Sequence, residues 1–235
     1  ALLPSRPERK SRQAQRGTVE KAEFLIYLTV ANFQIEKRFL KRGFQSIAGV
    51  DEVGRGALFG PVVAAAVIFP SPAIRGVLSG WLRDVNDSKL LPPQKRKRLA
   101  RFILNHAQAL GIGMATNLEV DQANIFQASL LAMKRAVENI PITPDLLLVD
   151  GLILKDVNYF QIGIPKGDRK SISIAAASVV AKVVRDEMMI FLDKVYGGYS
   201  LHKNKGYGTK EHFRALKEHG PTPFHRLTFN LSPKA

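Results

Sequence analysis

The sequence predicts an α/β fold, in which a mixed sheet is flanked by helices and joined to a helical C-terminal part and a basic N-terminal arm. From residue 47 onward, short apolar runs alternate with longer segments of helical periodicity. The first two runs are too close in the chain for a crossover helix, so they are expected to pair antiparallel. Later runs are separated by helical segments and can pair in parallel, and 235 residues are enough to bury one full core.

The first 46 residues form the predicted arm. Residues 1–17 are rich in Arg, Ser, Pro and Gln and are predicted to be disordered, whereas residues 19–42 have helical spacing that ends in the basic stretch EKRFLKRG. Residues 1–46 contain ten Lys or Arg and four Glu. This excess of positive charge fits an arm that contacts a polyanion, and it fits a solubilising tail equally well.

The remaining elements follow from hydrophobic periodicity. Five apolar runs are predicted to be strands: 47–51 (IAGVD), 61–69 (PVVAAAVIF), 109–116 (ALGIGMAT), 145–150 (DLLLVD) and 159–164 (YFQIGI). Four segments are predicted to be helices: 92–107, 118–139, 170–193 and 209–218. Two helix starts have further support, because Pro92 and Pro93 suit a first helical turn, and Thr116 and Glu119 have the spacing of a capping box.

The composition limits the class of partner and of metal site. A net charge of +15 is typical of a chain that binds nucleic acid, although a basic surface can also be merely solvated. Because the chain has no cysteine, disulfides and thiolate metal sites are excluded, and any metal must have oxygen or imidazole ligands. The apolar stretch at 24–33 is too short to span a bilayer. We expect a monomeric, cytoplasmic protein without membrane association.

Two of the predicted strands end in carboxylates, and a further acid stands where the long helix begins. Asp51 and Glu52 follow the first strand, Asp150 ends the fourth, and Asp168 lies in the stretch KGDRKS. Ligands of open α/β sheets bind beyond the carboxyl ends of the strands, so these four acids can converge on one cleft. Their mutual repulsion is relieved by hard cations such as Mg²⁺, and two ions about 3.5–4 Å apart can act on a phosphodiester. Together with the basic surface, this pattern favours phosphodiester hydrolysis.

The chain contains six sequence blocks in this order: AGVDEVGRG, GPVVAAAVI, VNDSKLL, LLLVDG, KGDRKSISIAAASVVAKVVRDEMM and NKGYGTKEHFRALKEHGPTPFHR. They resemble bacterial ribonuclease HII, at family-like spacings, from residue 44 to 229. The resemblance implies that residues 47–235 are a catalytic domain with an RNase H-like fold. It implies cleavage on the 5′ side of ribonucleotides embedded in duplex DNA, and of the RNA in RNA/DNA hybrids, as part of ribonucleotide excision repair. The products would carry a 3′-hydroxyl and a 5′-phosphate.

The resemblance also implies a metal site and a sugar-sensing loop. The family's ligand acids fall on Asp51, Glu52, Asp150 and Asp168, which would hold two Mg²⁺ or Mn²⁺ ions. Its Gly-Arg-Gly loop, which meets the minor groove and recognises the ribose 2′-hydroxyl, falls on Gly54, Arg55 and Gly56. The 2′-hydroxyl is the group that distinguishes RNA from DNA at a single site.

The other expected substrate contacts come from later blocks. Tyr207 matches a family tyrosine that packs on the sugar beside the junction, although a turn aromatic can also simply close a sheet edge. Lys89 resembles a family phosphate contact. Ser178, Lys182 and Arg185 stand at positions i, i+4 and i+7, so they share one helical face and are expected to hold phosphates. Such a basic face is also commonly just solvated.

Three other classes fit the sequence less well. Ribonuclease HIII has a large extra N-terminal domain, a Gly-Lys-Gly loop and Glu as the fourth acid, whereas this chain has Arg55 and Asp168. A type 1 ribonuclease H has different sequence blocks. A non-enzymatic nucleic-acid binder accounts for the charge, but four converging acids repel phosphate unless metal ions bridge them. A cleavage assay beside a metal-free binding assay separates the binder from the enzyme.

Overall fold

The computed structural model describes residues 31–76, 80–85, 88–155 and 157–232. Its five-stranded sheet has the order β3-β2-β1-β4-β5. The strands are β1 Ile47–Val53, β2 Val62–Ile68, β3 Ala109–Ala115, β4 Leu146–Asp150 and β5 Gln161–Ile164. The helices include α2 Gln34–Leu40, α3 Ser71–Arg75, α4 Pro93–His106, α5 Asn117–Glu138, α6 Ile172–Val195, α7 Leu201–Asn204 and α8 Lys210–His219. The 3₁₀ turns include η1 Gly80–Asp84, η2 Ser88–Leu90 and η3 Gly167–Arg169.

The sheet has both of the strand directions predicted from the chain spacing. β1 pairs antiparallel with β2, and β2 pairs antiparallel with β3. β4 lies parallel to β1, with Val149 opposite Val50, and β5 lies parallel to β4. The next residues, Asp51 and Asp150, therefore lie side by side toward the carboxyl ends of two neighbouring parallel strands. This is the edge at which α/β sheets bind ligands. The expected mixed sheet flanked by helices is confirmed.

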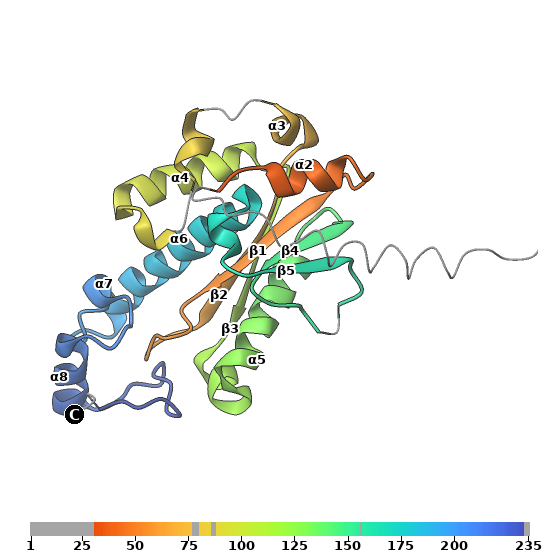
Figure 1. Cartoon of the computed structure of the whole chain (residues 1–235). Helices are drawn as coiled ribbons and strands as arrows, with labels where there is room; N and C mark the ends of the chain where they lie inside the picture. The colour runs from red at the N-terminus through yellow and green to blue at the C-terminus, as the bar shows by residue number, and fades with distance from the viewer. Residues whose placement is uncertain (1–30, 77–79, 86–87, 156, 233–235) are drawn as a thin grey trace, which may run out of the picture.

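Helices cover both faces of this sheet (Figure 1). α6 packs on one face, so close to β1 that a Cβ on Gly49 would lie 2.1 Å from the carbonyl carbon of Ser173. α5 packs on the other face, where a Cβ on Gly113 would lie 2.2 Å from the carbonyl oxygen of Ala132. Glycine at these two positions permits direct contact between helix and strand backbones. The start of α6 is thereby held against the strand that carries Asp51.

The N-terminal segment shares the core with the rest of the chain from residue 31 onward. Phe33, Phe39 and Leu40 belong to the same buried cluster as α6, while residues 1–30 of the expected arm lie outside the described residues. The helix predicted over 19–42 is wrong at Asn32. This residue forms a bridge to the start of α6, because its N–H donates to Lys170 and its carbonyl accepts from Ile172.

Three details of the helices differ from the prediction, the first being the short α3, which was not expected. The helix expected over 118–139 begins with the predicted capping box of Thr116 and Glu119, but it is kinked at Asn124, whose φ is +71°. The short α7 lies between two residues with left-handed backbone, Ser200 and Lys205, and was not expected. α7 and α8 pack around a separate apolar cluster near the C-terminus. No helix within the described ranges is long and apolar enough to cross a membrane.

Candidate active site

Three carboxylates meet at the edge formed by the ends of β1 and β4. Alternation along the strands places Asp51 and Asp150 on the face covered by α6 and Glu52 on the face covered by α5. Asp51 is 5% exposed, and its Oδ1 accepts a hydrogen bond of 2.7 Å from the N–H of Glu52. The Glu52 carboxylate accepts one of 3.2 Å from the guanidinium of Arg55. The three acids therefore lie at the position predicted from the strand ends.

The fourth acid enters from the turn that precedes α6. In η3, the N–H of Gly167 donates a hydrogen bond of 2.6 Å to Oδ1 of Asp150, so the backbone beside Asp168 is joined to the end of β4. Asp168 itself is half-buried. Throughout the described part of the chain, no three acidic or histidine side chains lie close enough together to hold a metal ion as they stand. Asp51, Glu52 and Asp150 lie together at one edge of the sheet, and each accepts a hydrogen bond from its protein surroundings, while Asp168 is next to the residue that bonds to Asp150.

Burial and mutual repulsion disturb the titration of this group. Burial raises the pKa of Asp51 well above 3.8, and the charges of Glu52 and Asp150 raise it further. Burial also raises the pKa of Glu52 from 4.5 to about 7, against the lowering effect of Arg55. Crowded oxygen donors whose ionisation is disfavoured are relieved by a bound cation. The residues present therefore fit hard divalent ions.

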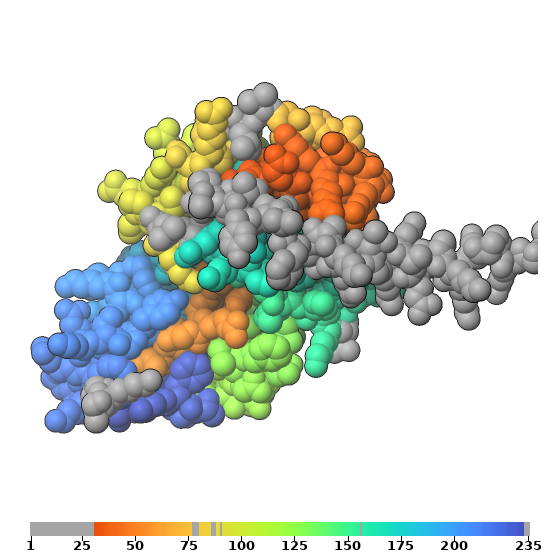
Figure 2. Space-filling view, in the orientation of Figure 1, coloured from red at the N-terminus to blue at the C-terminus, as the bar shows by residue number. Residues whose placement is uncertain are grey.

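The Gly-Arg-Gly loop follows Asp51 and Glu52 in the chain. Gly54 has a φ of +94°, and a Cβ there would lie 2.2 Å from Nε of Arg185. Gly56 is different, because a Cβ on it would meet nothing within 4 Å. The side chain of Arg55 is 44% exposed and reaches back to Glu52, which is 7% exposed. Figure 2 shows orange residues from the region of β1 and this loop at the surface, between the blue C-terminal part and the green α5.

Tyr207 lies against this loop and against α6. It forms a bridge to Ala57, and the neighbouring carbonyl of Gly206 accepts a hydrogen bond from Leu58. The cationic groups of Lys182 and Arg185 each lie 5.5 Å from the centroid of the Tyr207 ring. The sequence-predicted loop and aromatic residue are therefore adjacent, although 150 residues of chain separate Ala57 from Tyr207.

The expected phosphate-binding residues have different surroundings. Ser178 is buried, and its hydroxyl lies 2.9 Å from that of Ser88 and also contacts Asp51. Lys89, beside Ser88, is exposed, whereas Lys182 is partly buried and donates to Asp186. Lys89 is thus the most accessible of the expected phosphate contacts.

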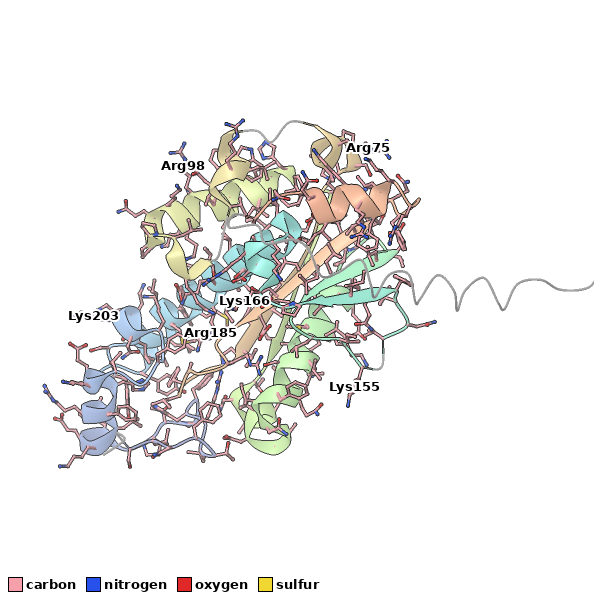
Figure 3. All side chains as sticks on the ribbon, in the orientation of Figure 1. Arg75, Arg98, Lys155, Lys166, Arg185 and Lys203 are labelled. Atoms are coloured by element: carbon pink, nitrogen blue, oxygen red, sulfur yellow. The ribbon has the colours of Figure 1, made fainter. Side chains whose placement is uncertain are left out.

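Arg185 does not have the surroundings expected of a phosphate contact. Its side chain is fully buried and points toward the middle of the molecule, whereas Arg98 and Lys203 extend from the rim (Figure 3). Its guanidinium donates to the carbonyls of Phe59, Pro61 and Lys205 at 2.8–3.0 Å. Because these three acceptors use its nitrogens, Arg185 braces the segment after the Gly-Arg-Gly loop. Periodicity correctly predicted its helical face but had no information on the loop that covers it.

The chain resembles known proteins over most of its length. The Ribonuclease HII family model matches residues 48–232. The ribonuclease HII of Lactobacillus delbrueckii subsp. bulgaricus is 48% identical over 229 residues, which cover 97% of this chain and 82% of the relative. The chain belongs to the ribonuclease HII family. The ribonuclease HII of Caldanaerobacter subterraneus subsp. tengcongensis is also 48% identical, over 83% of this chain and 78% of that protein.

Solved structures agree with this membership. Ribonuclease H2 from Pyrococcus horikoshii OT3 has a TM-score of 0.62 at 25% identity, over 80% of this chain and 95% of that one. Bst-RNase HIII in complex with Mn²⁺ shares the fold, with a TM-score of 0.59 at 24% identity over 80% and 68% of the two chains. The RNase H-like fold is thus confirmed. As a ribonuclease HII, the chain is an endonuclease that hydrolyses RNA in RNA/DNA hybrids.

Sequence reasoning missed the role of one buried arginine in this ribonuclease HII. Arg226 is fully buried. It donates hydrogen bonds to the carbonyl of Arg55, within the loop, and to that of Gly60, in the segment after the loop. Nearby, His212 and His225 are buried with their Nε2 atoms 3.1 Å apart. Arg226 ends the last of the six sequence blocks, in FHR, but nothing in the sequence tells which part of the chain it contacts.

Proposed function

We propose that this ribonuclease HII cuts the phosphodiester on the 5′ side of a ribonucleotide embedded in duplex DNA, leaving a 3′-hydroxyl and a 5′-phosphate, and so acts in ribonucleotide excision repair. The observation that carries the proposal is the closeness of the clustered acids to the Gly-Arg-Gly loop. Asp51, Glu52 and Asp150 supply clustered carboxylates at the sheet edge, and the Gly-Arg-Gly loop begins two residues after Glu52. Reactive groups and a candidate sugar sensor are therefore joined by a short, well-anchored piece of chain.

The residues that would hold two Mg²⁺ or Mn²⁺ ions are Asp51, Glu52, Asp150 and Asp168. Such ions supply activation of water and neutralisation of charge on the reacting phosphate. The chain contributes the crowded oxygen donors that favour a cation. It also joins the backbone next to Asp168 to β4 through the hydrogen bond from Gly167 to Asp150. In addition, Ser178, which lies on α6, donates a hydrogen bond to the Asp51 carboxylate and so helps to orient it.

Other residues would orient the nucleic acid. The backbone of Gly54, Arg55 and Gly56 would pair with a ribose 2′-hydroxyl, and the open space beside Gly56 supports this role. Tyr207, beside the loop, would pack on the neighbouring sugar. The exposed Lys89 and the partly buried Lys182 would attract phosphates by charge. Arg185 would act indirectly, by bracing the loop segment.

A cleavage assay with matched duplexes tests the proposal. We expect the protein to cut a DNA duplex with one embedded ribonucleotide, on its 5′ side, only when Mg²⁺ or Mn²⁺ is added. An all-DNA duplex of the same sequence is expected to remain intact, and an RNA/DNA hybrid is expected to be cut. Product ends are identified by ligation and by mass. Cleavage of the hybrid without cleavage of the single-ribonucleotide duplex would leave family membership intact but contradict the proposed substrate.

The pH dependence of stability tests the metal site without a cleavage assay. The pKa of Glu52 is about 7 in the folded chain against 4.5 ordinarily, so between these values the folded chain retains a proton that the unfolded chain has released. Rising pH therefore removes stability across this range. In EDTA we expect the melting temperature to fall over it. Added Mn²⁺ is expected to raise the melting temperature more at about pH 8 than at about pH 5.5, because the ion binds ionised carboxylates. Equal Mn²⁺ shifts at both pH values would contradict the assignment.

A further inference from the structure

Arg226 forms several hydrogen bonds to the Gly-Arg-Gly loop and to the residues that follow it, and no sequence pattern indicated them. Its Nη1 donates a hydrogen bond of 2.9 Å to the carbonyl of Arg55, and its Nε donates one of 3.0 Å to Gly60. Its backbone N–H donates to the carbonyl of Leu58 at 2.9 Å. One residue near the C-terminus thus binds three carbonyls of the segment 55–60, one of them within the loop itself.

Packing alone does not account for an arginine at this position. The side chain is fully buried, and burial lowers its pKa to about 9, with a further contribution from the charge of Arg185. Its Nη2 has no hydrogen-bond acceptor among the described residues. A buried donor without a partner is destabilising, and an apolar side chain of similar volume would avoid that cost. The planar fork, however, can reach two separate carbonyls at once, which no apolar residue can do.

The segment that carries Arg226 is itself anchored to α5. Asp121 accepts hydrogen bonds from the N–H groups of Leu227 and Thr228 at 2.9 and 3.0 Å, and from the Thr228 hydroxyl at 2.6 Å. Asn117 donates to the carbonyls of Pro223 and His225. The segment 223–228 is therefore held at the first turns of the helix that covers one face of the sheet.

The loop is consequently held from two sides. Arg185, on α6, donates to Phe59 and Pro61 and lies under Gly54, whereas Arg226 is held by α5 and donates to Arg55 and Gly60. α5 and α6 lie on opposite faces of the sheet. A loop fixed to both layers keeps its backbone groups in one position relative to the carboxylates at the end of β1.

We propose that Arg226 is a positioning residue that determines ribonucleotide selectivity by fixing the backbone of the Gly-Arg-Gly loop. The inference deepens the proposed function and rests on it, because it assumes that this loop senses the 2′-hydroxyl. Arg226 does not touch the reacting atoms. It acts through the carbonyl of Arg55, and its loss leaves the metal-ligand acids in place, since those are held by β1, β4 and η3.

Arg226→Lys tests this role, because lysine keeps the charge but cannot span two carbonyls. We expect cleavage of the single-ribonucleotide duplex to fall about 10- to 100-fold, as for a displacement of the reacting phosphate by up to about 1 Å. On a duplex with four consecutive ribonucleotides, Arg226→Lys is expected to cut also at the phosphates next to the one that the wild type cuts. Mn²⁺ binding, followed by electron paramagnetic resonance, is expected to match the wild type.

Arg135→Lys is the matched control. Arg135 also donates to a backbone carbonyl, that of Met114, and pairs with Glu119, but it lies away from the loop on α5. Its variant is expected to lose some stability and to keep the wild-type rate and cut position. The inference is overturned if Arg226→Lys cuts at the same rate and position as Arg135→Lys.

Two further comparisons keep the result decisive. If Arg226→Lys does not fold, Asp121→Ala frees the same segment while leaving the Arg226 side chain in place, and it is expected to spread the cuts in the same way. Wild-type cutting by a folded Asp121→Ala variant would then overturn the inference. If the wild type itself does not distinguish the ribonucleotide duplex from all-DNA, the proposed function fails, and that outcome is visible before any variant is compared.

Discussion

An Asp51→Asn variant is expected to cut the single-ribonucleotide duplex roughly 1,000-fold more slowly than the wild type, the upper end of the loss for one preorganised electrostatic group. Its melting temperature is expected to rise. Asp51 is 5% exposed, and burial together with Glu52 and Asp150 raises its pKa. An ionised group there opposes folding, whereas asparagine has nearly the same shape and no charge. A stability gain accompanied by loss of activity marks a residue retained for function.

Single-turnover rates in Mg²⁺ and thermal denaturation measure the two effects separately. Duplex affinity is expected to change little, because it depends chiefly on Lys and Arg contacts to phosphates. Asp145→Asn is a suitable control, since Asp145 precedes β4 at the opposite edge of the sheet and accepts hydrogen bonds from Gln45 and Ser46. It is expected to cut normally. Near-normal turnover by Asp51→Asn would remove this residue from the metal site.

Gly56→Ala is expected to reduce cleavage of the same duplex by about 100-fold without changing the melting temperature. A Cβ at Gly56 would meet nothing within 4 Å, and its φ lies outside the left-handed region, so the folded chain accommodates the methyl group. The space it fills is where the ribose is expected to approach. A displacement of the reacting phosphate by about 1 Å is enough for a loss of this size.

Two other glycines make the result interpretable. Gly197, in the turn between α6 and α7, also has open space around a Cβ and an ordinary φ, so Gly197→Ala is expected to behave as the wild type. Gly54→Ala is expected to lower stability as well as activity, because φ is +94° and the Cβ would meet Arg185. Unimpaired cleavage by Gly56→Ala would show that substrate does not approach the loop at this residue.

Local patterns were sufficient for most of the elements. The strand spacing predicted that β1 and β2 are antiparallel but not that β2 and β3 are, and the capping box at Thr116 marks the start of α5. Prediction failed where a long-range contact replaced a local one. Asn32 leaves the expected helix because it pairs with the start of α6. The kink of α5 at Asn124 is a separate failure, because there the Asn124 side chain accepts from the nearby N–H groups of Phe126 and Gln127 within continuous helical periodicity. Propensity is a weak signal that tertiary contacts override.

The sequence by itself determined which acids stand at strand ends and can therefore converge, and the parallel pairing of β1 with β4 in the structure brings Asp51 and Asp150 side by side. The role of the Gly-Arg-Gly loop, two residues beyond Glu52, was expected from the family resemblance. Only the tertiary structure decided what holds that loop. Arg185 and Arg226 have the same side chain and identical local preferences as any surface arginine, and their burial depends on carbonyls that lie more than 100 residues away in the chain. Charge and periodicity describe a residue's own segment, whereas the acceptors of a buried guanidinium exist only once distant segments have packed around it.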